Sequence, residues 1–246
     1  MRLRADGMNW HTLGLQRFDE CDDKVTGPSV DVLDSGTKGC VVSHLKMIQK
    51  WYNETDEEYA FFCEDDLSLK TVDYWNFTWE EFVESLPDDA ECVQLCCVRP
   101  DEIDIQLRER SSYDWSVTAY ILTRDYAKKI IDRYCLEDSY HLEIFDTGFY
   151  PMPENVLFYG LGKVYSINLF VEDQTLQSTF TEINQLETGQ KEYHTETYNH
   201  VMNWWKLNGK NANIISKKDV PMKKKYEDEV QKLLTNFALN PEDPDA

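Results

Sequence analysis

Apolar residues recur along the chain with two spacings, one typical of helices and one typical of buried strands. In GCVVSHLKMIQKWY, residues 39–52, apolar side chains return every three or four positions, which predicts an amphipathic helix opened by glycine. YAFFC, residues 59–63, is a short apolar run of the kind found in buried strands. The pattern therefore predicts a helix followed by a core strand.

The same alternation continues through the middle of the chain. Residues 135–160 are rich in proline and polar residues and read as a loop. The other predicted elements are helices over 71–87 and 124–135, and strands over 91–98, 116–123 and 162–174. Strands that alternate with helices predict an α/β domain with a mostly parallel central sheet flanked by helices.

Two predicted strands run directly into acidic residues. YAFFC is followed by Glu64, Asp65 and Asp66, and the strand over 162–174 ends with Glu172 and Asp173. Because ligands of α/β sheets gather at the carboxyl ends of strands, both groups are candidate site residues. The alternative is a solvated strand end whose acids cap a turn.

The spacing of the first acidic group favours a metal ion. In an extended chain Glu64 and Asp66 share one face, and Asp65 points the other way. Two carboxylates on one face suit Mg²⁺ or Mn²⁺, which commonly bind through one or two carboxylates together with substrate phosphates. The sequence therefore indicates a metal–diphosphate site.

Composition narrows the choice of partners and location. The 246 residues suffice for one large domain, and 41% of them are hydrophobic. A formal net charge of −21 argues against binding to nucleic acids, and against docking on anionic membranes by charge. No stretch approaches the roughly 20 apolar residues of a membrane span. The first residues also lack the apolar run of a signal peptide, so we expect a cytoplasmic protein.

The cysteines predict buried thiols rather than a zinc site. The chain has seven, irregularly spaced and mostly in apolar surroundings. The segment CVQLCC would suit zinc only with a second pair of cysteines or histidines at ligand spacing, and the sequence shows no such pair.

A series of short motifs resembles glycosyltransferase family 25, which includes lipopolysaccharide galactosyltransferases and the collagen hydroxylysine galactosyltransferases. The resemblance covers roughly residues 36–180, and its motifs are GCVVSH (39–44), CEDDLSL (63–69), VQL (93–95), TAYILTRDYAKKII (118–131), FDTGFY (145–150) and VYSINLFVEDQTLQSTF (164–180). It implies a GT-A-like nucleotide-sugar-binding fold over 1–180. Residues 181–246 are then expected to form a polar, helical extension packed on this domain, with a frayed acidic tail.

One feature of the family is missing from this sequence. Family members usually open with a strand that supports the nucleotide base, and LQRFDECDD, residues 15–23, resembles the strand after it. Either the chain lacks this opening strand or the sequence is truncated ahead of it, and a missing strand would put donor affinity and activity in question.

The resemblance implies a metal-dependent glycosyltransferase, generally classed as inverting. It would move a hexose, galactose or glucose, from a UDP-sugar to a hydroxyl group of a glycan, a lipopolysaccharide or a protein. Glu64–Asp66 would be the DXD motif, in which Asp66 ligates Mn²⁺ or Mg²⁺. Glu64 would contact a metal-bound water or the ribose, and Asp65 would contact the donor sugar.

Inversion requires a general base that takes a proton from the acceptor hydroxyl. Asp146, in the loop FDTGFY, is the first candidate, and Glu172 or Asp173 is the second. For Asp146 the alternative is a residue that caps its loop.

Four further residues are candidates for contacts with the nucleotide sugar. Gly39, Ser43 and His44 lie near the predicted start of a helix, where free N–H groups suit phosphate. For His44 a packed histidine is an equal alternative. Gln94 is a candidate for facing the donor, but a buried amide bonded to neighbouring backbone is the favoured interpretation.

The aromatic residues of two other segments predict packing. Trp75, Trp79 and Phe82 have helical spacing and are expected in the core. Trp204 and Trp205, near His194 and His200, suit either a sugar-stacking surface or packing, and packing is favoured.

Three other functions are compatible with the sequence. The first is a catalytically inert GT-A-like binding or assembly module. The second is a plain divalent-cation-binding protein, although no D-x-[DN]-x-[DN]-G loop is present. The third is a phosphohydrolase, for which no paired set of metal ligands is visible.

Overall fold

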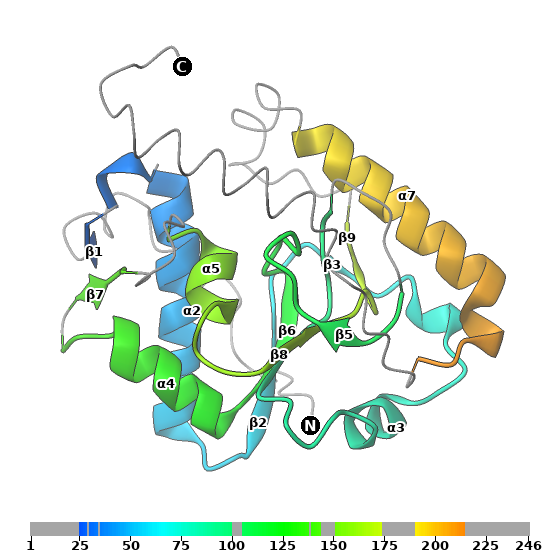
Figure 1. Cartoon of the computed structure of the whole chain (residues 1–246), viewed down its shortest axis with the longest axis horizontal. Coiled ribbons are helices and arrows are strands. Elements are labelled where there is room, and N and C mark those ends of the chain that lie inside the picture. Colours follow the sequence, from blue (N-terminus) through cyan, green and yellow to red (C-terminus); the bar gives the residue numbers. More distant parts are fainter. Residues whose placement is uncertain are drawn as a thin grey trace.

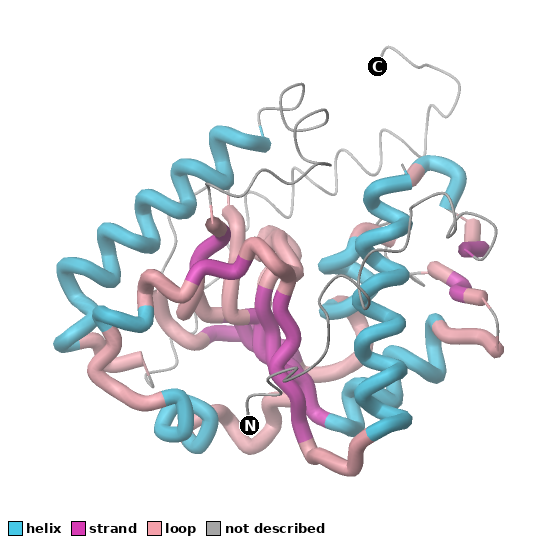
Figure 2. Tube along the Cα trace, turned by 180° about the vertical axis from the view of Figure 1, so that it is seen from behind, coloured by secondary structure: helices cyan, strands magenta, loops and turns pink. Residues whose placement is uncertain are grey.

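The computed structural model describes residues 25–28, 30–33, 35–99, 105–137, 139–143, 151–173 and 190–214. In this part of the chain helices cover both faces of a central sheet (Figures 1 and 2). The expected α/β class is therefore confirmed.

The central sheet is mixed. Its five strands lie in the order β2 (Tyr59–Cys63), β6 (Ala119–Thr123), β4 (Cys92–Gln94), β8 (Val164–Ser166) and β5 (Arg108–Glu109). Only the β4–β8 pair among these described strands is parallel, and the other three pairs are antiparallel. The prediction of a mostly parallel sheet is wrong because β6 inserts between β2 and β4 and runs against both. A continuous apolar run is typical of any buried strand and carries no direction.

The strands that end near the acidic residues nevertheless run the same way. β2 and β4 are both antiparallel to β6, and β8 is parallel to β4. The carboxyl ends of β2, β4 and β8 therefore share one edge of the sheet.

One face of the sheet is covered by α2 (Ser35–Glu54), α4 (Arg124–Tyr134) and α5 (Pro153–Phe158), as Figure 1 shows. α2 and α4 confirm the helices predicted over 39–52 and 124–135, although α2 begins at Ser35. α5 lies within the segment predicted as a loop and has a proline at its start, where the missing N–H is harmless.

The opposite face carries α3 (Trp79–Glu84) and α7 (Gln190–Asn208), together with the short antiparallel pair β3 (Leu67–Ser68) and β9 (Val171–Glu172). The helix predicted over 71–87 is shorter than expected and follows a 3-10 turn, η4 (Val72–Tyr74). The reason is a capping box, in which the Thr78 hydroxyl accepts the Glu81 N–H and the Glu81 carboxylate accepts the Thr78 N–H.

α7 lies against β9 and helps to form the hydrophobic core on this face of the sheet (Figure 1). Val201, Met202 and Trp205 are buried there, and the Trp205 indole donates a hydrogen bond to the Asn168 carbonyl at 2.9 Å. Trp205 is therefore a packed residue.

The aromatic prediction for the same core is confirmed. Trp75 and Phe82 are buried in it, and Trp79 packs against it.

The remaining described elements are short. They are β1 (Val25–Thr26), which pairs with β7 (Tyr140–His141), and the 3-10 turns η3 (Val30–Val32) and η5 (Gly209–Asn211). Among the described residues no helix has the length and apolar character to cross a membrane. The segment predicted as an acidic tail lies outside the described residues.

Candidate metal-binding site

The two acidic groups meet at the shared carboxyl edge of the sheet. β3 pairs with β9 so that Leu67 lies opposite Glu172, and the Asp173 N–H donates to the Asp66 carbonyl at 2.6 Å. Residues more than 100 positions apart are thus side by side. The structure brings together Glu64, Asp66 and Glu172, and we call these three residues the acidic cluster.

Thr118 joins two members of the acidic cluster. Its hydroxyl oxygen lies 3.1 Å from Glu64 Oε2 and 3.1 Å from Glu172 Oε1. A hydroxyl has one hydrogen and can donate to only one of these carboxylates at a time. The Ser116 hydroxyl in turn donates to Thr118 at 2.9 Å. The cluster therefore holds more acceptor oxygens than this pair of hydroxyls can satisfy.

Asp66 is the least compensated of the three acids. Its Oδ1 is buried and has no hydrogen-bond partner among the described residues. Burial, together with the negative charges of Glu64, Glu172 and Asp65, raises the pKa of Asp66 to about 7. A buried carboxylate oxygen without a partner costs free energy. A cation at this position would supply the missing partner.

Glu64 is bound on its other side by α2. Its Oε1 lies 3.4 Å from His44 Nε2 and 3.7 Å from Cys40 Sγ. Burial raises the pKa of Glu64, but the hydrogen bond and charge of His44, helped by Thr118 and Cys40, outweigh it and hold that pKa below its usual value. Glu64 is therefore an ionised member of the cluster.

His194 of α7 binds the far side of the cluster. Its Nδ1 lies 2.5 Å from Glu172 Oε2, and the two side chains are 25% and 12% exposed. Burial lowers the pKa of His194, but the hydrogen bond and charge of Glu172 raise it more, so that the pKa lies above its usual value. The sequence pattern missed this pair because α7 lies in a polar stretch with no recognisable motif.

Two predicted site residues lie at the margin of the cluster. Asp65 is exposed and lies with Asp66 in the turn between β2 and β3, rather than in an extended strand. Asp173 is 23% exposed and lies 3.9 Å from the Lys70 ammonium group. Asp146, the first candidate for the base, lies outside the described residues and stays a prediction.

The phosphate argument for the start of α2 does not hold. Because α2 begins at Ser35, Gly39, Ser43 and His44 lie inside the helix rather than in its first turn. Backbone N–H groups beyond the first four residues bond within a helix. These residues therefore offer no free N–H groups to a phosphate.

Gln94 is a packed residue. Its Nε2 lies 2.7–3.2 Å from the carbonyl oxygens of Asp114, Trp115 and Ser116, enough acceptors for both of its hydrogens, and its Oε1 accepts from Arg110 and Ser166. Both ends of the amide are engaged, as the favoured interpretation of a buried amide bonded to neighbouring groups expects.

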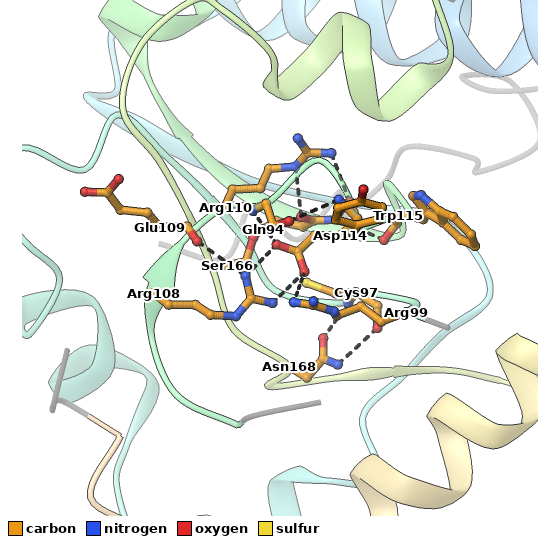
Figure 3. A network of polar contacts seen from close by, with 12 residues as sticks. Gln94, Cys97, Arg99, Arg108, Glu109, Arg110, Asp114, Trp115, Ser166 and Asn168 are labelled. Atoms are coloured by element: carbon orange, nitrogen blue, oxygen red, sulfur yellow. Dashed lines mark hydrogen bonds and ion pairs between the residues drawn. The ribbon is translucent and has the colours of Figure 1, made fainter. Parts of the chain in front are cut away.

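A second charged cluster, drawn in Figure 3, is fully paired. Asp114 is 0% exposed, and its carboxylate accepts two bonds from Arg108 at 2.5 Å, one from Arg99 at 3.2 Å and one from the Ser111 N–H at 2.7 Å. Burial raises the pKa of Asp114, but Arg108 and Arg99 outweigh it and hold that pKa below its usual value. No oxygen of this carboxylate is left for a ligand, so the cluster is structural.

The sequence pattern also missed a group of three residues whose side chains can bind a metal ion. Cys40, His44 and Glu64 each offer one ligand atom, and these three atoms lie within 4.8 Å of one another. The spacing C-x-x-x-H on a predicted helix was the available signal, because residues four apart share a helix face.

No protein-family model matches this chain, and no curated protein matches it either.

Proposed function

We propose that this protein is a metal-dependent glycosyltransferase that moves a hexose from a nucleotide diphosphate sugar, a UDP-hexose, to a hydroxyl group of a glycan, a lipopolysaccharide or a protein. The observation that carries the proposal is the buried Asp66 Oδ1, which lacks a hydrogen-bond partner among the described residues and lies in a cluster with Glu64 and Glu172. A cation at this position would supply the missing partner and reduce the repulsion between the three acids.

Carboxylates are the ligand type that a hard divalent cation prefers. Oxygens of Glu64, Asp66 and Glu172 do not all lie within 4.8 Å of one another, so such an ion would be held by one or two of these acids. Asp66 would hold Mn²⁺ or Mg²⁺ through its unpartnered oxygen, Glu64 would add a second carboxylate, and water and diphosphate oxygens would complete the shell of the ion. When bound, such an ion acts as a Lewis acid that stabilises the leaving nucleoside diphosphate. The chain's own contribution is to concentrate negative charge where that ion must sit.

The fold supports the same location for the donor. β2, β4 and β8 end at the edge of the acidic cluster, and crevices at the carboxyl ends of strands are the usual ligand sites of α/β sheets. A GT-A-like fold and an inverting outcome are part of the proposal and rest on the motif resemblance.

The proton acceptor in this proposal is the Glu172–His194 pair. Of the two predicted bases that the structure describes, Glu172 is the one whose carboxylate joins the cluster, and it binds His194 Nδ1. A carboxylate on one imidazole nitrogen orients the ring so that the other nitrogen can take a proton. Glu172 would thus position His194 to accept the proton of the acceptor hydroxyl through Nε2.

The second candidate function is an inert GT-A-like binding module. The observation that favours it is the engagement of both Glu64 oxygens, Oε1 by His44 and Cys40 and Oε2 by Thr118. A DXD motif with one acid already engaged would hold a donor less firmly.

The two candidates separate in one experiment. Calorimetry measures UDP binding with and without Mn²⁺, and a coupled assay measures UDP release from UDP-galactose and UDP-glucose. We expect Asp66→Asn to weaken Mn²⁺-dependent UDP binding by more than about tenfold, since changes around a bound metal commonly cost that much.

The matched control is Asp88→Asn. Asp88 is an exposed acid ahead of β4, at the opposite edge of the sheet, and its loss should leave UDP binding unchanged. UDP binding without any release of UDP from either sugar identifies the inert module. No UDP binding with any divalent ion contradicts both candidates.

A further inference from the structure

We propose that Cys40, His44 and Glu64 form a second metal site, which takes a thiolate-binding divalent transition metal ion, with zinc the best fit. The site is separate from the one proposed at Asp66, although both use the Glu64 carboxylate. It does not depend on the proposed function.

Two of the three distances between the ligand atoms match those around a tetrahedral zinc ion. A zinc ion with bonds of about 2.3 Å to sulfur and about 2.0–2.1 Å to nitrogen and oxygen would hold sulfur and oxygen about 3.6 Å apart, and nitrogen and oxygen about 3.4 Å apart. Cys40 Sγ lies 3.7 Å from Glu64 Oε1, and His44 Nε2 lies 3.4 Å from the same oxygen. All three atoms lie within 4.8 Å of one another. The side chains would need little movement to bind the ion.

The backbone fixes these side chains in place. Cys40 and His44 lie one turn apart on α2, so both project from the same face of the helix. Glu64 directly follows β2, and its N–H donates to the Thr118 carbonyl at 2.9 Å. An ion at this point would tie α2 to the end of β2.

The outer partners of the ligands are also present. His44 Nδ1 lies 2.9 Å from the hydroxyl of Tyr120, a fully buried residue whose ring stacks on Phe62. This contact leaves Nε2 facing Cys40 and Glu64, and the Tyr120 hydroxyl can accept as well as donate. Histidine ligands usually bind an outer partner through their second nitrogen in this way.

The types of ligand select the ion. One thiolate, one imidazole and one carboxylate suit zinc and other borderline ions, whereas Mg²⁺ and Mn²⁺ prefer sets of oxygens. Three protein ligands leave a fourth position for water. We therefore expect the two proposed sites to take different ions, a thiolate-binding ion between α2 and β2 and a hard ion at Asp66.

Cobalt(II) is the spectroscopic probe for this site, because it replaces zinc and gives an intense charge-transfer band when bound to a thiolate. We expect the full chain to take up one equivalent of Co²⁺ with such a band, and excess Zn²⁺ to remove it. Cys40→Ser should abolish the band, and His44→Gln should weaken Co²⁺ binding by more than about tenfold.

Cys63→Ser is the matched control. Cys63 is another half-buried thiol and precedes Glu64 directly. It packs against the hydrophobic core that contains Trp205, on the other face of the sheet from Cys40. Its loss should leave the cobalt band intact. No band in the unmodified chain, or a band that disappears with Cys63→Ser and survives Cys40→Ser, overturns the proposal.

Two further measurements guard against misfolded variants and against confusion with the first site. X-ray absorption of the zinc-loaded, unmodified chain should show one sulfur ligand at about 2.3 Å, and a shell of nitrogen and oxygen alone overturns the proposal. Asp66→Asn should keep the cobalt–thiolate band while losing Mn²⁺-dependent UDP binding. Failure of either site is therefore distinguishable from failure of the other.

Discussion

Two charged regions of this protein use carboxylates in opposite ways. In the region of Figure 3, Asp114 is buried between Arg108 and Arg99, and each of its oxygens accepts hydrogen bonds. In the acidic cluster, by contrast, Asp66 has a buried oxygen without a partner among the described residues, and Glu64 and Glu172 share one hydroxyl.

The difference separates a structural cluster from a candidate site. Burial of a charge is tolerated when cations and hydrogen bonds compensate it, and the Asp114 region meets that condition. The acidic cluster meets it only in part, because His44 and His194 lie against Glu64 and Glu172, whereas Asp66 has no such partner among the described residues. An uncompensated buried acid requires an explanation, and a bound cation is the simplest one.

The largest expected effect is a loss of stability when the paired carboxylate of Asp114 is removed. Asp114→Ala leaves Arg108 buried without its main partner, so we expect a loss of about 3–5 kcal/mol in the free energy of unfolding. Urea denaturation measures it. In the absence of metal, Asp66→Asn should lower the free energy of unfolding far less, because it removes a charge that lacks a cationic partner. Equal losses in the two variants would remove the distinction between the regions.

A smaller gain in stability should appear when Mn²⁺ is added and binds at the acidic cluster. Because an ion that binds only the folded state stabilises it, Mn²⁺ at 100 times its dissociation constant adds about 2.7 kcal/mol, or roughly 5–10 °C in Tm for a chain of this size. Thermal unfolding with and without Mn²⁺ measures this shift. We expect it in the unmodified chain and in Asp114→Asn at its own lower Tm, and not in Asp66→Asn. A shift that survives Asp66→Asn places the ion elsewhere.

The smallest expected effect concerns pH. Glu172 raises the pKa of His194 in the folded protein, so this pair contributes stability below the unfolded pKa of about 6.5, and that stability is lost as pH rises through the folded pKa. The contribution should be below about 1 kcal/mol, since the imidazole is 25% exposed. Denaturation from pH 5 to pH 9 should therefore show a steeper fall for the unmodified chain than for His194→Gln. Parallel curves for both proteins would contradict the assignment.

Local pattern was enough to locate most of the elements. YAFFC forms β2 over the predicted residues, and the helices around Val41 and Ile130 are present because an apolar stripe must be buried whatever it packs against. The prediction over 71–87 erred because Thr78 starts a new helix. α7 lies within the stretch expected as a helical extension, but its bounds were not predicted because it follows a polar segment and packs through only a few apolar side chains, such as Trp205.

For the candidate site, the sequence by itself determined that three acids follow a buried core strand, since residue order and apolar burial are local properties. It did not determine which acids are compensated. Thr118 lies 54 positions from both Glu64 and Glu172, and His194 lies 22 positions from Glu172. Only the tertiary structure decided these contacts, because hydrogen bonds and charges act over a few ångströms in space, and the insertion of β6 and the docking of α7 set those distances.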